Sequence, residues 1–311
     1  MNDVVLTVGE VVAVMEELYP PSVAAEWDAV GLIAGDPTAP VRRVLFAIDP
    51  VLPVADEAIA MSADLIITHH PLFLRGVHSV AADTYKGALV HRLIQNGVAL
   101  YNAHTNADSA PRGVAAALTD LLGIVHQRPL VPESSLAVTD GEGAAVVADG
   151  VANGANYGIG RIGDLPETVT LAELAATLAT RLPKTAQGVR VAGNLAGEVR
   201  RVAVVGGSGD SLFDAVRSAS ADVYVTADLR HHPASELRER AIFEGSGKPY
   251  LLDVAHFASE WPWLVYAAED LAAASATAIA TRGGEGRIEC QISTLRTDPW
   301  DAVFGRDFQE R

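Results

Sequence analysis

Histidine and acidic residues recur in this chain at spacings that suit metal binding. His69 and His70 are adjacent and close an apolar run, and two further pairs have the form His-x-x-x-acid: His104 with Asp108 and His256 with Glu260. Imidazole and carboxylate groups make a mixed nitrogen and oxygen donor set that suits Zn, Mn, Fe, Co or Ni. The set exceeds the needs of one open catalytic metal, and it predicts two metals that share a carboxylate.

The histidine doublet has two interpretations. Successive side chains of an extended strand point to opposite sides, so one metal would have difficulty taking both rings, whereas two metals would not. Pro71 follows the doublet and biases His70 toward extended geometry. The alternative is an ordinary hydrogen-bonded pair at the end of a strand, and the doublet alone does not separate the two.

The second His-x-x-x-acid pair also has an ordinary explanation. His256 and Glu260 share a face if residues 256–260 form a helical turn. An acidic residue near a helix N-terminus is nevertheless favourable without any metal, because negative charge stabilises that end. The pair supports a metal site chiefly in combination with the doublet and with the positions of all these residues after predicted strands.

An internal repeat relates two parts of the sequence. Val41-Arg42-Arg43-Val44 opens a run that ends at Thr68, and Val199-Arg200-Arg201-Val202 opens a run of equal length that ends at Thr226. The doublet of the first copy aligns with Ala227 and Asp228 of the second. We therefore expect two related halves, and no metal site of the first kind in the second half alone.

The predicted elements indicate an α/β fold. We expect helices over residues 7–19, 53–62, 83–96 and 170–182, and strands over 43–49, 64–68, 98–102 and 286–293; residues 140–160 favour an irregular connection. Strand–helix alternation is typical of helices packed on mostly parallel sheets, whose ligands bind beyond the carboxyl ends of strands. The prediction is a first α/β half over 1–125, a connecting segment with a helix over 126–198, and a second α/β half over 199–311. The metal site is expected in the cleft between the halves.

Composition narrows the functional classes. The 311 residues carry a formal charge of −16, which disfavours general nucleic-acid binding and binding to anionic membranes. The single cysteine excludes an internal disulfide and fits a reducing, cytoplasmic setting. We find no signal peptide and no membrane span in the sequence.

The ordered motifs resemble the Nif-three-like dinuclear metal-centre family, whose members are often labelled type-two homologues of GTP cyclohydrolase I. The resemblance covers nearly the whole chain and rests on Trp27-Asp28-x-x-Gly31-Leu32, Thr68-His69-His70-Pro71-Leu72, His104-Thr105-Asn106-Ala107-Asp108, Gly158-Ile159-Gly160-Arg161-Ile162-Gly163 and His256-x-x-x-Glu260. A long inserted domain found in some relatives has no counterpart in this sequence.

The resemblance implies roles for these residues. His69 and Asp108 would hold one divalent metal, His70 and His256 the other, and Glu260 would bridge them. His104 would act from outside the ligand set, on the substrate or on a proton. The resemblance also implies a homo-oligomer, with a hexamer expected.

Three other features have weaker interpretations. Gly206-Gly207-Ser208-Gly209 favours a tight strand-to-helix turn over a phosphate loop, because the spacing and the lysine of known phosphate loops are missing. Arg161 is a candidate contact for an anionic substrate. His231 and His232 either line the cleft or simply begin a helix before Pro233.

The expected function is metal-dependent hydrolysis of a nucleotide or a related small molecule. Two metals lower the pKa of bound water and orient it for attack. The alternative is a non-enzymatic protein that binds or delivers metal, or a regulatory scaffold, because the same ligands serve that role.

Overall fold

A computed structural model describes residues 4–133, 138–139, 145–146 and 156–304 of the chain. The chain forms two compact units, each of which is discontinuous in sequence. The first comprises residues 1–114, 132–158 and 263–295, and the second comprises residues 115–131, 159–262 and 296–311. Each unit contains one large sheet with its own helices.

The first unit contains a five-stranded sheet in the order β15-β4-β5-β6-β2. Its strands are β2 (Gly31–Ala34), β4 (Arg43–Ala47), β5 (Leu65–Thr68), β6 (Ala99–Asn102) and β15 (Glu289–Ile292). The four strands β15, β4, β5 and β6 are parallel, and β2 is antiparallel to β6 at one edge. The strands predicted near 43–49, 64–68, 98–102 and 286–293 are confirmed.

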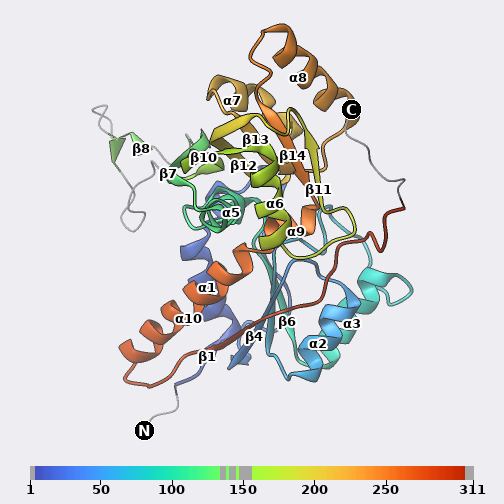
Figure 1. The fold of residues 1–311 in the computed structure, drawn as a ribbon. Coiled ribbons are helices and arrows are strands. Elements are labelled where there is room, and N and C mark those ends of the chain that lie inside the picture. Colours follow the sequence, from blue (N-terminus) through green and yellow to red (C-terminus); the bar gives the residue numbers. More distant parts are fainter. Residues whose placement is uncertain (1–3, 134–137, 140–144, 147–155, 305–311) are drawn as a thin grey trace. The chain divides into compact units, whose positions relative to one another are not determined.

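Helices cover both faces of this sheet, with α2 and α3 on one face and α1 and α10 on the other (Figure 1). The helical elements of the unit are α1 (Val8–Leu18), η1 (Pro21–Val23), α2 (Leu52–Ala60), α3 (Tyr85–Gln95), α4 (Thr105–Ser109) and α10 (Trp263–Thr281); the short strands β1 (Leu6–Thr7) and β3 (Pro40–Val41) pair with each other. Burial on both faces explains why the central strands are apolar throughout. The core against α2 and α3 includes Leu45, Ile66, Leu100, Val54 and Leu93.

The second unit contains a six-stranded sheet in the order β11-β14-β13-β12-β10-β7. Its strands are β7 (Val125–Pro132), β10 (Gly158–Thr170), β11 (Val189–Ala192), β12 (Glu198–Ser208), β13 (Val223–Ala227) and β14 (Tyr250–Val254). The strands β12, β13 and β14 are parallel, whereas β10 is antiparallel to β12 and β11 is antiparallel to β14. This sheet is therefore mixed, and the expectation of a mostly parallel sheet holds only for the first unit.

The helical elements of the second unit are α5 (Val114–Leu122), α6 (Leu171–Arg181), η3 (Asp210–Leu212), α7 (Phe213–Ser218), α8 (His231–Phe243) and α9 (His256–Glu260). Apart from α5, which precedes β7, they follow the strands of the unit. Both predicted capping boxes are present: Thr7 with Glu10 begins α1, and Thr170 with Glu173 begins α6. In each, the threonine hydroxyl accepts from the glutamate N–H, and the glutamate carboxylate accepts from the threonine N–H.

The internal repeat is confirmed by matching hydrogen bonds in the two units. In each copy an aspartate just before the second strand accepts from two consecutive backbone N–H groups at the first strand: Asp64 from Arg42 and Arg43, and Asp222 from Arg200 and Arg201, all at 2.7–2.9 Å. A serine two residues earlier has φ of 55° in each copy. The two copies thus share one local structure.

The units do not coincide with the contiguous halves expected from the sequence. The strand near residues 286–293, assigned to the second half, pairs with β4 in the first sheet. The region 126–198, treated as a connection, instead supplies β7, β10 and β11 to the second sheet. Strand pairing between residues far apart in the chain produces both differences.

The irregular connection predicted over 140–160 lies mostly outside the described residues. Within it the structure describes β9 (Ala145–Val146), which pairs with β8 (Val138–Thr139), and the beginning of β10. No helix among the described residues is both long and apolar enough to cross a membrane.

Candidate metal centre

Three parallel strands of the first unit end beside the candidate ligands. β4 ends two residues before Asp49, β5 ends immediately before His69, and β6 ends two residues before His104. Neighbouring parallel strands bring their carboxyl ends to one edge of the sheet. The sheet therefore gathers side chains that are far apart in sequence.

The imidazole of His69 is fully buried, and its orientation is fixed by a backbone acceptor. Its Nδ1 lies 3.0 Å from the carbonyl oxygen of Ala103. A carbonyl can only accept a hydrogen bond, so Nδ1 carries the proton and Nε2 carries the lone pair. Nε2 lies 3.8 Å from Oδ1 of Asp108. The ring thus directs Nε2 toward the predicted carboxylate ligand.

The imidazole of His70 is held in the same way by a carboxylate. Its Nδ1 lies 2.7 Å from Oδ1 of Asp49, which comes from the end of β4. Carboxylate–histidine pairs of this kind orient metal-ligating imidazoles and raise the basicity of the other nitrogen. The sequence did not predict a role for Asp49. This residue follows a buried strand, and no recognisable motif surrounds it.

His104 is held by the aspartate of the Trp27-Asp28 motif. Its Nδ1 lies 3.0 Å from both carboxylate oxygens of Asp28, which also accepts from the backbone N–H and the hydroxyl of Thr105. Burial by itself would raise the pKa of Asp28, but the hydrogen bonds from His104 and Thr105 hold it well below its usual range. Asp28 is therefore an ionised acceptor that fixes the His104 ring.

The structure brings His69, His70 and His104 together. One potential ligand atom from each lies within 4.8 Å of the others, and the ring centroids are 5.1–5.6 Å apart. The opposed orientation expected for the doublet is wrong, because His69 and His70 form a bend after β5 and do not continue the extended strand. His104, expected outside the ligand set, lies as close to the doublet as a ligand would.

In the second unit His256 and Glu260 form the predicted pair on one helical turn. They are the first and last residues of α9, and His256 Nε2 lies 2.9 Å from Oε1 of Glu260. The Nδ1 of His256 lies 2.7 Å from Oδ2 of Asp228. Asp228 occupies the position of His70 in the repeat, so the second copy has a carboxylate acceptor where the first has an imidazole.

The electrostatics of this pair suit a cation. Burial alone would lower the pKa of His256, but the charge of Glu260 and the hydrogen bond with Asp228 outweigh it and raise the pKa to about 11. The hydrogen bond from His256 in turn lowers the pKa of Asp228. Without a metal, a proton therefore stays on an imidazole that lies against two carboxylates. A divalent cation would satisfy the same excess of negative charge.

The glycine-rich end of β12 leaves room for this pair. Gly207 has φ of +65°, and a Cβ at this position would lie 2.6 Å from Oε1 of Glu260 and 3.2 Å from Nε2 of His256. Its backbone N–H donates to Ser259 and its carbonyl accepts from Thr226. Residues 206–208 belong to β12, so the tight turn predicted for this segment is limited to Gly209 before η3, and the close approach to α9 explains the glycine at position 207.

The other candidates have different surroundings. Arg161 is buried in β10, its Nη1 donates to the carbonyl of Gly160, and burial lowers its pKa to about 10. His231 and His232 begin α8, as the alternative interpretation expected. In the described part of the chain neither of them belongs to a group that could hold a metal. The complete set of His69, His70, Asp108, His256 and Glu260, and its location in a cleft, stays a prediction.

Comparison with known proteins identifies relatives of the whole chain. The sequence model of the family described as Duf34/NIF3 (NGG1p interacting factor 3) matches residues 6–284. A Streptomyces coelicolor protein named GTP cyclohydrolase 1 type 2 homolog is 48% identical over 293 residues, which cover 94% of this chain and 93% of that protein.

A longer relative and a solved crystal structure also match nearly the whole chain. A Mycobacterium tuberculosis protein with the same name is 34% identical over 388 residues, which cover 96% of this chain and 98% of that protein. That span exceeds the 311 residues of this chain, so the relative has inserted residues that this chain lacks. The crystal structure of a Staphylococcus aureus hypothetical protein, 27% identical, superimposes with a TM-score of 0.78 and covers 96% of this chain and 100% of that one.

Proposed function

The chain belongs to the Duf34/NIF3 family, and we propose that it binds two divalent metals and uses them to hydrolyse a nucleotide or a related small molecule. The proposal rests on a feature that four histidines share. They are His69, His70, His104 and His256. Each has Nδ1 within 3.0 Å of an oxygen acceptor. This arrangement leaves Nε2 of each ring available, as a metal ligand in His69, His70 and His256 and as a proton acceptor in His104.

The donor set fits a metal of intermediate softness. Neutral imidazoles with carboxylates suit Zn, Mn, Fe, Co or Ni better than Mg or Ca, which prefer oxygen ligands alone. We assign His69 and Asp108 to one metal, His70 and His256 to the other, and Glu260 to a bridging position. The assignment follows the family resemblance, and within the units it is supported by the His69–Asp108 and His256–Glu260 contacts.

Hydrolysis requires a nucleophilic water and a path for its proton. Bound divalent metals would lower the pKa of such a water toward neutrality. We assign proton transfer to Nε2 of His104, because Asp28 holds the opposite nitrogen of that ring. An ionised Asp28 stabilises the imidazolium that forms when His104 accepts a proton.

A metal-reconstituted activity screen tests this function. The chelated protein is loaded with each candidate metal and assayed on nucleotides, pterin precursors and phosphoesters, and the names of the relatives make GTP the first substrate. Turnover should appear only with metal and should be lost in Glu260→Ala. His91→Ala, which changes an exposed histidine on α3, is the matched control and should keep full activity.

The alternative is a protein that binds or delivers metal without turnover. The same ligands serve both functions, so metal content alone does not separate them. Metal binding that is lost in Glu260→Ala, with no turnover on any substrate of the screen, would favour delivery or a scaffold. Activity that survives thorough chelation would contradict the metallohydrolase proposal.

A further inference from the structure

A pocket of about 380 Å³ lies in the second unit, formed by residues that the proposed metal chemistry does not use. One wall is the face of α8 formed by His231, Ala234, Ser235 and Arg238. These residues have the spacing i, i+3, i+4, i+7 and therefore lie on one side of the helix. The volume is at the lower end of the range found for small-molecule sites.

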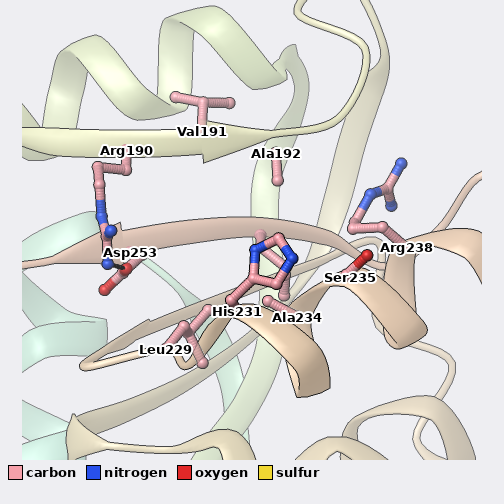
Figure 2. Close-up of a pocket in the computed structure, with 10 residues that line it drawn as sticks. Arg190, Val191, Ala192, Leu229, His231, Ala234, Ser235, Arg238 and Asp253 are labelled. Carbon is pink, nitrogen blue, oxygen red and sulfur yellow. Dashed lines mark hydrogen bonds and ion pairs between the residues drawn. The ribbon is translucent and has the colours of Figure 1, made fainter.

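The opposite wall is made by the edge strand β11 and its neighbour β14. Arg190 is paired in register with Asp253, and Ala192 with Leu251, and all four residues line the pocket. Figure 2 shows Arg190 and Asp253 at one end, Ser235 and Arg238 at the other, and His231 between them. The pocket thus has chemically different ends.

At one end of the pocket, one oxygen of the Asp253 carboxylate has no hydrogen-bond donor among the described residues. Asp253 is 5% exposed; its Oδ2 pairs with Arg190, and its Oδ1 has no hydrogen-bond partner among the described residues. A buried carboxylate oxygen without a partner is costly. An N–H group from a ligand in the pocket would satisfy it.

The other end offers donors and positive charge. Arg238 is held in place by its Nη1, which donates at 2.6 Å to the carbonyls of Gly247 and Pro249, and its guanidinium lies 5.3 Å from the ring centroid of Tyr250. Its remaining N–H groups, with the hydroxyl of Ser235 and the imidazole of His231, suit a phosphate or a carboxylate. The first turn of α8, a helix of 13 residues, adds favourable potential for an anion.

We propose that this pocket binds a small organic anion that also carries an amino or imino N–H donor. The anionic group contacts Arg238 and Ser235, and the N–H group contacts the carboxylate of Asp253. Two arginines against one aspartate leave the lining with a net positive charge, although the whole chain has a formal charge of −16. This binding needs no metal and is independent of the proposed hydrolase function.

Calorimetric titration of the chelated full-length protein tests the proposal with four probes. AMP carries a phosphate and an amino group, 4-aminobenzoate carries a carboxylate and an amino group, ribose 5-phosphate lacks the amino group, and adenosine lacks the anion. Binding of AMP or of 4-aminobenzoate, tighter than that of both single-feature probes, supports the proposal and shows which anion the pocket prefers. No binding of either amino-bearing anion at millimolar concentration overturns it.

Variants locate the binding. Arg238→Met should lower the affinity for the probe by about 10- to 100-fold, as expected for the loss of a charge-assisted hydrogen bond. Ser235→Asp places a negative charge at an exposed position of the same wall, and it should weaken binding even if Arg238→Met fails to fold. Arg240→Met removes an exposed arginine of α8 that pairs with Glu244, and it should bind as the unaltered protein does. Equal affinity in Ser235→Asp and Arg240→Met would overturn the proposal.

Discussion

Nδ1 of His70 lies 2.7 Å from Oδ1 of Asp49, although the two residues follow different strands, β5 and β4. The carboxylate fixes the tautomer of the ring, so Nε2 keeps the lone pair that would bind a metal. The same relationship recurs in the second unit between His256 and Asp228. Ring orientation by acceptors outside the ligand set is therefore a property of both copies of the repeat.

Asp49→Asn should lower metal affinity by about 10- to 100-fold. A neutral amide holds the His70 ring less strongly than a carboxylate does, and it leaves Nε2 of that ring less basic. Competition titration against a chromophoric chelator measures the change. Asp56→Asn is the matched control, since Asp56 is a half-exposed acid on α2 that pairs with Arg92. Equal affinity in the two variants would contradict the role given to Asp49.

The fully loaded protein should contain about two divalent metals per chain. Glu260→Ala should lose most of the metal, because it removes the bridging carboxylate, and His69→Ala should lose part of it. Elemental analysis after gel filtration gives the stoichiometry. The double variant His231→Ala/His232→Ala should keep its metal, and near-complete loss in that variant would show that the site was misplaced.

The chelated protein should become less stable as pH rises from about 7 to 10. Burial lowers the pKa of His256, but Glu260 and Asp228 raise it to about 11 in the folded state, whereas the unfolded chain has the ordinary value of about 6.5. Between these values the folded state holds the extra proton, so its stabilising effect is complete below the lower pKa and is lost as pH rises through the higher one. Urea unfolding at several pH values measures the slope.

His256→Gln is the control for this pH dependence. The variant lacks the titrating group, so its slope between pH 7 and 10 should be clearly smaller than that of the unaltered protein. Metal binding near pH 8 should also release the His256 proton, which an unbuffered titration would detect. Identical slopes of stability against pH in the two proteins would show that His256 is not the origin of the pH dependence.

Gly207→Ala should impair both folding and metal binding. Its φ of +65° disfavours any side chain, and the added Cβ would collide with Glu260. Gly188→Ala is a close control, because Gly188 has φ of +63° and nothing within 4 Å of the added Cβ. Both variants should lose about 1–3 kcal/mol of unfolding free energy from backbone strain. Only Gly207→Ala should also lose metal affinity in the chelator titration.

The chain should assemble into a homo-oligomer, with a hexamer expected from the family resemblance. Multi-angle light scattering at micromolar concentration measures the mass of the assembly directly. A mass equal to that of a single 32.6 kDa chain would contradict this prediction.

Local features of the fold were predictable because their causes lie within a few residues. The capping box of Thr7 and Glu10 needs only a helical turn, and the His256–Glu260 contact needs only the i and i+4 spacing. The repeat was visible because both copies use the same strand–helix–strand pattern. The family resemblance added an ordered set of motifs, and the comparisons confirm it.

Pairing between distant segments was not predictable from these patterns. β15 joins β4 rather than the second sheet, because strand edges are matched by packing of the whole unit and not by sequence proximity. The acceptors Asp49 and Asp228 carry no motif of their own, and they reach His70 and His256 only when parallel strands end side by side. The sequence by itself determined the types of the candidate metal ligands, and it determined the helical turn that carries two of them, His256 and Glu260. The tertiary structure decided which carboxylates orient the histidines and why Gly207 must lack a side chain, since both depend on atoms brought within a few ångströms from remote parts of the chain.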